Sequence, residues 1–286
     1  MVHSTWGDWF VQDEIEAADP DGLAVWYLGC NGYVLRTAET TMYLDPYLGD
    51  GSPPRTIRMI PVPMDPADAT LCDAVLVTHE HIDHMHPPSH RALVEDCGGD
   101  LYAPAASHDA PNYDGDVEAP PAETVAPGDD FTVGNLSIHV RGANDPDAEE
   151  PVTYVVEHES GTFFAAGDSR PADEFSDIAT EFDIDLGVLA YGTVGNIFHT
   201  EDNPSETYPT DWYNDGEQVV EAANQLDLDR LMPVHWDMWK GVGSDPKIVH
   251  EHAASYEHPR VVEIVSIGDR VDVGEPGVVQ LQDRRE

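Results

Sequence analysis

The amino-acid sequence predicts a layered α/β domain built from many short strands and a few helices. Short apolar runs rich in β-branched residues recur along the chain, and glycines and prolines, 23 of each, separate them. Stretches with helical spacing lie among these runs in both halves, which is the pattern of sheets covered by helices. A length of 286 residues with 41% hydrophobic residues supplies enough chain for a large core.

The first half is expected to form a meander, a strand, a helix and a hairpin, in that order. Residues 29–32 and 39–40 supply the turns of the meander. Two glycines at 98–99 end the helix, and Gly-Asn at 134–135 is a hairpin signal. The segment 104–128 is rich in Pro, Asp and Ala, and we expect a surface loop there. The expected elements are strands 24–28, 33–37, 41–44, 74–78, 131–133 and 136–141, and a helix over 89–97.

The second half alternates strands with helices. In the helix expected over 217–226, Val219, Ala223 and Leu226 share one face, which is typical of packing on a sheet. The last two strands are expected to pair with each other as a closing hairpin. The expected elements are strands 152–157, 162–166, 184–191, 231–234, 261–267 and 270–273, and helices 171–182, 217–226 and 246–256.

The charge balance is strongly acidic, with 13 Lys+Arg against 56 Asp+Glu and a formal net charge of −43. Such a chain offers no basic face for nucleic acid and no polybasic patch for an anionic membrane. The acidic residues are spread along the whole sequence, which favours a solvated surface suited to a very salty cytoplasm, where salt screens their repulsion. A dedicated cation-binding surface is the alternative interpretation.

The cysteine pattern and the apolar runs indicate a cytoplasmic protein. Cys30, Cys72 and Cys97 are an odd number, widely spaced and without a CxxC pair, so a reducing compartment is expected. No apolar run approaches the ~18 residues of a membrane span, and residues 1–10 lack a basic leader and an apolar core.

A histidine-rich motif, Thr-His-Glu-His-Ile-Asp-His at 78–84, follows the apolar strand at 74–77. In extended chain, residues two apart point to one side, so His79 and His81 can converge on one point. After the chain turns, Asp83 and His84 can reach a second point nearby. Imidazoles and a carboxylate are ligands for Zn²⁺, Mn²⁺ or Fe²⁺. A surface histidine patch is the alternative, but the strand that delivers the motif favours a metal site.

Two further candidate ligands stand at the ends of apolar strands. The run at 162–167 ends at Asp168, and the run at 231–234 ends at His235. A carboxylate such as Asp168 can bridge two cations, and His235 can complete the second ion's ligands. Alone, His235 would be an ordinary histidine beside Trp236, but the repeated placement at strand ends favours a ligand.

These motifs together resemble the metallo-β-lactamase superfamily: HxHxDH after a strand, a later Gly-Asp-Ser at 167–169 and a histidine at a strand end. Within it, the chain is similar to the L-ascorbate-6-phosphate lactonase group in its tryptophan-bearing segments at 6–9, 26–30 and 233–239. The resemblance implies a four-layer αβ/βα sandwich, with two mixed β-sheets flanked by helices. It also implies a dinuclear metal site at the strand ends, homo-oligomer assembly, and one domain over 1–286 with an N-terminal extension (1–22) and a C-terminal tail (274–286).

The resemblance gives Asp45 the role of orienting a ligand loop from behind the metal site, although an Asp before Pro46 would also serve as a turn residue. The sequence departs from the superfamily where a mid-chain histidine ligand is usual. Asp145 is the best substitute by position, whereas His139 is expected to be a core or paired histidine. Either the first of the two divalent ions uses an oxygen ligand, which favours Mn²⁺ over Zn²⁺, or it is weakly held.

The expected activity is metal-assisted hydrolysis of an ester-like carbonyl, most concretely the ring ester of a sugar-acid lactone. Asp83 would position the nucleophile or move its proton, Asp168 would join the two ions, and no cysteine is required. If the small-molecule substrate carries phosphate, candidate contacts are few; Arg170 beside the Gly-Asp-Ser segment can equally balance the surrounding acids. The candidates are Arg58, Arg170, His199 and Lys240.

Three rival functions remain open at this point. A phosphodiesterase or RNA-processing nuclease on the same fold is disfavoured by the acidic charge, which repels polyanions. Hydrolysis of β-lactams is disfavoured by the intracellular cysteine pattern. A non-catalytic metal-binding protein would not need the whole ligand set from His79 to His235.

Overall fold

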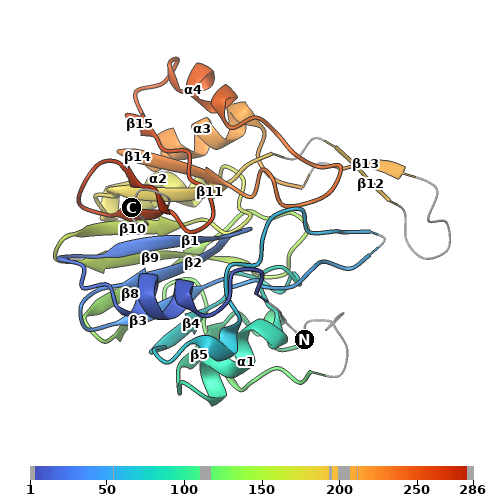
Figure 1. Ribbon diagram of the computed structural model, residues 1–286. Coiled ribbons are helices and arrows are strands. Elements are labelled where there is room, and N and C mark those ends of the chain that lie inside the picture. Colours follow the sequence, from blue (N-terminus) through green and yellow to red (C-terminus); the bar gives the residue numbers. More distant parts are fainter. Residues whose placement is uncertain are drawn as a thin grey trace.

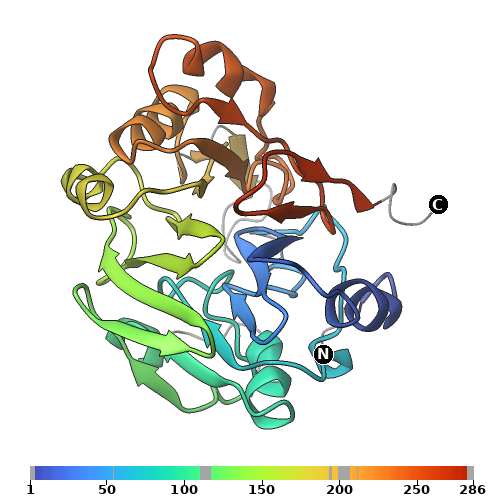
Figure 2. The same cartoon turned by 90° about the vertical axis from the view of Figure 1, so that its left-hand side faces the viewer.

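Two β-sheets packed face to face form the centre of the protein, and helices cover the outer face of each (Figures 1 and 2). The structure is a computed structural model that describes residues 4–53, 55–109, 117–192, 195–198, 207–210 and 212–281. The predicted four-layer αβ/βα sandwich of two mixed sheets is confirmed. None of the helices in these ranges is long and apolar enough to cross a membrane.

The first sheet has the strand order β17-β16-β1-β2-β3-β4-β5-β6. Strands β1 to β3 form the predicted antiparallel meander, and β3 to β6 run parallel to one another. Parallel strands place their carboxyl ends at one edge of a sheet. The strands of this sheet are β1 (Ala24–Gly29), β2 (Gly32–Arg36), β3 (Thr41–Leu44), β4 (Ala74–Leu76), β5 (Asp100–Ala103), β6 (Ala122–Thr124), β16 (Arg270–Asp272) and β17 (Val278–Val279).

The second sheet has the order β15-β14-β11-β10-β9-β8-β7, and a separate hairpin is formed by β12 (Gly195–Phe198) and β13 (Thr207–Thr210). Strands β7 to β10 are antiparallel, while β10, β11, β14 and β15 are parallel. The strands of this sheet are β7 (Asp130–Val133), β8 (Leu136–Gly142), β9 (Val152–His158), β10 (Gly161–Ala165), β11 (Leu186–Ala190), β14 (Arg230–Val234) and β15 (Val261–Val262).

The helices lie where the sequence predicts them, with small shifts at their ends. Helix α3 begins with a capping box in which Asp215 accepts from the backbone of Gln218 and the Gln218 side chain accepts from the backbone of Asp215. The helices are α1 (Pro87–Glu95), α2 (Asp173–Glu181), α3 (Gly216–Gln225) and α4 (Lys247–Ala253), with a π-helical segment at Phe10–Glu16 and 3-10 turns at Pro66–Asp68 and Ala105–Asp109.

Three of the four buried apolar clusters among the described residues form layers that hold the sandwich together. The central layer lies between the sheets and includes Tyr33, Tyr154 and Phe163. The second joins the first sheet to α1 and the segment Phe10–Glu16, and the third joins the second sheet to α2, α3 and α4. The sheets therefore form a rigid frame for side chains that follow the strand ends.

The closing hairpin predicted from 261–267 and 270–273 is wrong. Val261–Val262 pairs parallel to β14 in the second sheet, whereas Arg270–Asp272 pairs antiparallel to β1 in the first. The chain between them crosses from one sheet to the other and buries Val265 in the central layer. Two apolar runs around a Gly-Asp turn have the same local sequence pattern whether they pair with each other or with the edges of two different sheets. The local pattern therefore predicts the strands but not their partners.

The surface loop predicted at 104–128 is interrupted by an edge strand. Ala122–Thr124 forms β6, which pairs parallel to β5. Within the same segment, Ala105–Asp109 forms a 3-10 turn, and residues 110–116 lie outside the described residues.

Candidate metal centre

The candidate metal centre lies at the edge where strands of both sheets end. His79 follows β4, Asp168 follows β10, His235 follows β14 directly, and Cys30 follows β1. The backbone turns sharply at two of these positions: φ is 59° at Cys30 and 69° at His235, a left-handed conformation that costs energy for residues other than glycine. Packing of the sheets therefore holds these donor residues in place.

Gly167 lets the chain that carries Asp168 approach the chain that carries His79. Its φ is 58°, and a Cβ atom there would stand 2.8 Å from Oγ1 of Thr78. Any larger residue would push the two strand ends apart.

Four donor side chains form a first cluster, composed of His79, His81, Asp145 and Asp168. Nε2 of His79 lies 2.9 Å from Nδ1 of His81 and 3.6 Å from Oδ2 of Asp145. Oδ2 of Asp145 is also 3.7 Å from Nδ1 of His81. All four donor atoms lie within 4.8 Å of one another, so one cation could contact them together. Asp145 therefore lies among the donors of the first cluster.

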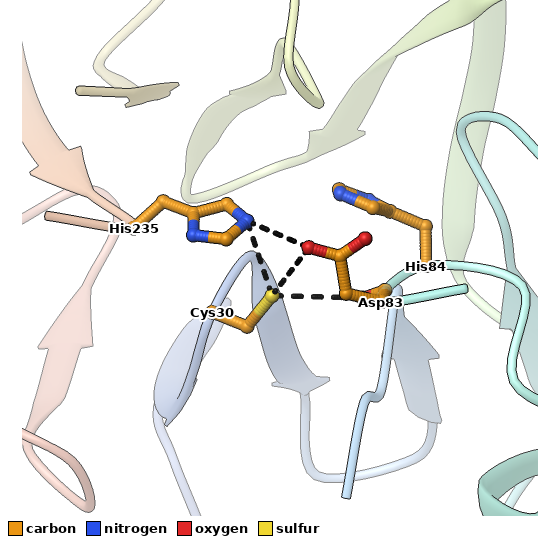
Figure 3. Close-up of side chains that lie close together, drawn as sticks. All are labelled: Cys30, Asp83, His84 and His235. Atoms are coloured by element: carbon orange, nitrogen blue, oxygen red, sulfur yellow. Dashed lines mark hydrogen bonds and ion pairs between the residues drawn. The ribbon is translucent and has the colours of Figure 1, made fainter. Parts of the chain in front are cut away.

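Four more donors form a second cluster, composed of Cys30, Asp83, His84 and His235 (Figure 3). Oδ2 of Asp83 lies 3.2 Å from Nε2 of His235. Sγ of Cys30 lies 3.2 Å from the same nitrogen and 3.7 Å from the same oxygen. These donor atoms again lie within 4.8 Å of one another.

Asp168 lies between the two clusters. Its Oδ2 is 3.9 Å from Nε2 of His79 and 3.3 Å from Nε2 of His84, and its Oδ1 is 4.0 Å from Nε2 of His235. A carboxylate with both oxygens in reach of two donor sets can join two cations. The structure thus brings His79, His81, Asp83, His84, Asp145, Asp168 and His235 into one centre.

Asp45 lies behind the histidines, on the side away from the two clusters. It accepts from the backbone and hydroxyl of Thr78, at 2.8 and 2.6 Å, and its Oδ2 lies 2.7 Å from Nδ1 of His84. Because the Thr78 hydroxyl donates to Asp45, it accepts from Nδ1–H of His79, 2.9 Å away. Nδ1 of both histidines is therefore the donor to these oxygens, and Nε2 is the atom that points into the centre.

The donor atoms fit divalent cations. Among the described residues, Nε2 of His84 and Oδ2 of Asp145 are buried and have no hydrogen-bond partner. A buried polar atom without a partner costs about 1–3 kcal/mol. Both atoms belong to the two clusters, where a cation would accept their lone pairs and remove that cost.

The electrostatic field of the centre also favours cations. Burial alone would lower the pKa of His84, but the carboxylates of Asp168 and Asp45 outweigh burial and raise that pKa well above its usual value. Burial and the charge of Asp168 raise the pKa of Asp145 to about 6. Without metal, His84 and Asp145 thus hold protons in a centre that divalent ions could occupy instead.

The guanidinium of Arg58, a predicted substrate contact, is buried and committed to the backbone. It donates to the carbonyl oxygens of Tyr47, Gly49, Leu28, Ile60 and Pro61 at 2.8–3.5 Å, and so ties the loop after β3 to the first sheet.

The other predicted substrate contacts have varied positions. Arg170 is half-buried two residues after Asp168, and its backbone N–H donates to Asn144. Lys240 is exposed in the loop after β14, and His199 lies outside the described residues. His139 pairs with Asp130 and Glu157 on the outer sheet face, away from the clusters.

Sequence reasoning missed two residues of the centre. Cys30 belongs to the second cluster, and Asn31 donates to Oδ1 of Asp168 at 3.1 Å. The apolar run of β1 stops at Cys30 and Asn31, so the strand-end pattern that indicated Asp168 could also have found them. Tyr213 belongs to the aromatic segment 197–214, whose composition predicts either a pocket lining or a subunit contact, and its ring stacks on His235 with centroids 4.0 Å apart.

Comparison with known proteins agrees with this geometry. The family model described as "Beta-lactamase superfamily domain" matches residues 40–236, which include every cluster residue except Cys30. The chain belongs to the beta-lactamase superfamily. Together with the donor clusters, this membership makes it a metal-dependent hydrolase of the metallo-β-lactamase type.

Similar proteins extend the likeness beyond residues 40–236. The "Probable L-ascorbate-6-phosphate lactonase UlaG" of Escherichia fergusonii is 25% identical over 287 residues, covering 85% of this chain and 77% of that protein. Igni18, a metallo hydrolase from Ignicoccus hospitalis, superposes with a TM-score of 0.62 at 16% identity, covering 87% of this chain and 97% of that one. CmlA, a diiron β-hydroxylase from Streptomyces venezuelae, has a TM-score of 0.62 at 14% identity, covering 92% and 55%. At such identities the two structures show the fold alone.

Proposed function

We propose that the protein hydrolyses an ester-like bond, most concretely the ring ester of a sugar-acid lactone, at a dinuclear centre. The observation that carries this proposal is Asp168, whose carboxylate stands between two complete donor clusters. The similarity to a probable lactonase over most of the chain supports the lactone as substrate class. Mn²⁺ and Zn²⁺ are the ions that we propose for the clusters.

When bound, two divalent cations would polarise a carbonyl oxygen and acidify a water molecule. Asp83 would hold that water, because its Oδ2 faces the second cluster beside Nε2 of His235. Burial would raise the pKa of Asp83, but the hydrogen bond from His235 and the charge of His84 outweigh it and lower that pKa. Asp83 therefore stays ionised, so it would orient the nucleophile and pass a proton onward rather than store it.

The substrate would reach the centre from the side of His81. The side chain of His81 is 34% exposed, whereas those of His79, His84 and His235 are almost wholly buried. Tyr213 and Trp239 form an aromatic wall behind His235, and the indole N–H of Trp239 donates to the Tyr213 hydroxyl at 3.1 Å. Tyr213 and Trp239 are themselves almost wholly buried, so they would support His235 from behind while the substrate carbonyl approaches the bound ions from the side of His81.

A phosphate on the substrate would meet few cations. We propose Arg170 and Lys240 as its contacts, since Arg58 is committed to the backbone. The net charge of −43 disfavours polyanionic substrates such as nucleic acids. The three free cysteines support a reducing compartment such as the cytoplasm.

The test measures metal content and then hydrolysis of sugar-acid lactones, bis(p-nitrophenyl) phosphate and a cephalosporin at high salt. We expect about two ions per chain and lactone opening that chelation by EDTA abolishes. Asp168→Asn should abolish lactone opening, whereas Asp177→Asn, on the exposed face of α2, should not change it. Lactone opening that survives EDTA would refute the mechanism, and selective diester cleavage would replace the lactone with a phosphodiester as substrate.

A further inference from the structure

We infer that Cys30 is a direct sulfur ligand of the second cluster, so that the two metal positions of this centre prefer different ions. The inference deepens the proposed function, because it rests on the same dinuclear centre. Cys30 lies outside residues 40–236, the part of the chain that the family model matches.

The two clusters differ in donor chemistry. The first cluster offers two imidazole nitrogens, from His79 and His81, and two carboxylates, from Asp145 and Asp168. Half of its donors are therefore hard oxygen atoms. The second cluster replaces one carboxylate with the sulfur of Cys30. Thiolate sulfur selects softer ions such as Zn²⁺ and Co²⁺, whereas carboxylate oxygen suits Mn²⁺. The second position should therefore hold Zn²⁺ and the first should accept Mn²⁺.

The position of Cys30 supports coordination by sulfur rather than simple packing. Its Sγ stands 3.2 Å from Nε2 of His235 and 3.7 Å from Oδ2 of Asp83, the two atoms that face the same cation position (Figure 3). The side chain is completely buried and backed by Tyr47 and Tyr213. The left-handed backbone at Cys30, φ 59°, turns the chain between β1 and β2 at this residue. The sulfur of Cys30 therefore lies where it could bind the same cation as Asp83 and His235.

Coordination would replace the S–H bond of Cys30 with a sulfur–metal bond, and the proton would pass to solvent. No oxidation or reduction takes place. A cation in the second cluster therefore binds together with the loss of one proton from sulfur.

Cobalt spectroscopy tests the sulfur ligand directly. Co²⁺ is added to the metal-free protein, and the near-ultraviolet absorption that arises from thiolate-to-cobalt charge transfer is recorded. We expect this band in the wild type and in the Cys72→Ser/Cys97→Ser double variant, which keeps Cys30 as the only thiol. We expect the band to be lost in Cys30→Ser while the weaker visible bands of bound cobalt remain.

A competition experiment tests the difference between the two positions. The metal-free protein receives one Zn²⁺ and one Mn²⁺ per chain, so that zinc is limiting, and the ions retained after gel filtration are counted. The wild type should keep one Zn²⁺ and exchange Mn²⁺ readily. Loss of even an outer partner of a metal ligand costs about 10–100-fold in affinity, so Cys30→Ser should weaken Zn²⁺ retention at least as much.

A measurement on the unmodified protein covers the case in which Cys30→Ser does not fold. The ¹¹³Cd resonances of the wild type should show one ion shifted strongly downfield, as sulfur ligation requires, and one ion with only nitrogen and oxygen ligands. Two similar ¹¹³Cd shifts, or bound cobalt without a charge-transfer band, would overturn the sulfur ligand and leave the hydrolase proposal intact. Failure to bind any metal would overturn both.

Discussion

At the scale of single residues, the centre depends on hydrogen bonds one step behind the donor atoms. The Tyr33 hydroxyl donates to Oδ1 of Asn31 at 2.7 Å, and the Asn31 amide donates to Oδ1 of Asp168 at 3.1 Å. Asp45 and Thr78 accept from Nδ1–H of His84 and His79, and so orient the two histidines. These hydrogen bonds determine which atom of each ligand side chain points into the centre.

Replacing Asn31 with Leu should weaken metal binding about 10–100-fold, because Asp168 loses the donor that orients it. Tyr33→Phe, which removes only the donor to Asn31, should give a smaller loss. Calorimetric titration of the metal-free variants measures both. Tyr102→Phe, in the first sheet and stacked on Phe131, is the control and should bind like the wild type. An Asn31→Leu variant with unchanged affinity would contradict the role of Asn31.

Metal binding at the first cluster should weaken as the pH falls below about 6. Burial and Asp168 raise the pKa of Asp145 to about 6, so its carboxyl keeps a proton at a pH where an ordinary Asp is ionised. That proton must leave before a cation can bind. The apparent Mn²⁺ affinity should therefore fall by up to about tenfold for each pH unit below the pKa.

The electron paramagnetic resonance of free Mn²⁺ measures this affinity across the pH range. Asp145→Asn cannot hold the proton, so the variant should bind more weakly at neutral pH and lose this part of the pH dependence. An Asp145→Asn variant with the same pH profile as the wild type would assign the proton to another group.

At the scale of elements, the C-terminal segment that crosses from β15 to β16 is held by contacts that join the two sheets. Arg230 on β14 makes a two-fold contact with Glu263, with nitrogen–oxygen distances of 3.1 and 2.7 Å, and both side chains are buried. Arg230 also donates to the carbonyl oxygens of Asp272 and Val273, at the end of β16 in the other sheet. The crossing that replaced the predicted hairpin is therefore held by a buried ion pair.

Glu263→Ala should lower the free energy of unfolding by about 3–5 kcal/mol, because the change leaves the charge of Arg230 buried without its partner. Urea denaturation measures the loss. Glu95→Ala, which removes an exposed ion pair with Arg91 on α1, is the matched control and should leave the midpoint nearly unchanged. Equal midpoints for the two variants would show that the buried pair is not needed for the crossing.

At the scale of the whole molecule, the net charge of −43 should make stability depend on salt. Repulsion among acidic groups acts over about 10 Å at 0.1 M salt but only about 3 Å at 1 M. We expect Tm to rise by more than about 2–4 °C between 0.1 M and 1 M salt. A rise of that size corresponds to about 1 kcal/mol in the free energy of unfolding.

A comparison of salts separates the two interpretations of this charge. Thermal unfolding in KCl and in tetramethylammonium chloride at equal ionic strength should give the same rise if screening is the cause. A rise in KCl alone would favour a surface that binds cations specifically. A Tm that does not change with salt concentration would contradict both interpretations.

The sequence by itself determined most of the strand and helix segments and the seven residues from His79 to His235 that the centre collects. It did not predict β5, β6, β12, β13, β17 or the π-helical segment Phe10–Glu16. The predicted segments and residues depend on local patterns: apolar periodicity defines an element, and a single polar side chain after an apolar strand indicates the sheet edge. Tertiary structure alone decided that the last two strands join different sheets, that Arg58 is committed to backbone carbonyls, and that Cys30 meets His235. Each of these depends on which distant segments pack together, because the same local pattern has comparable energy in several pairings until the core selects one.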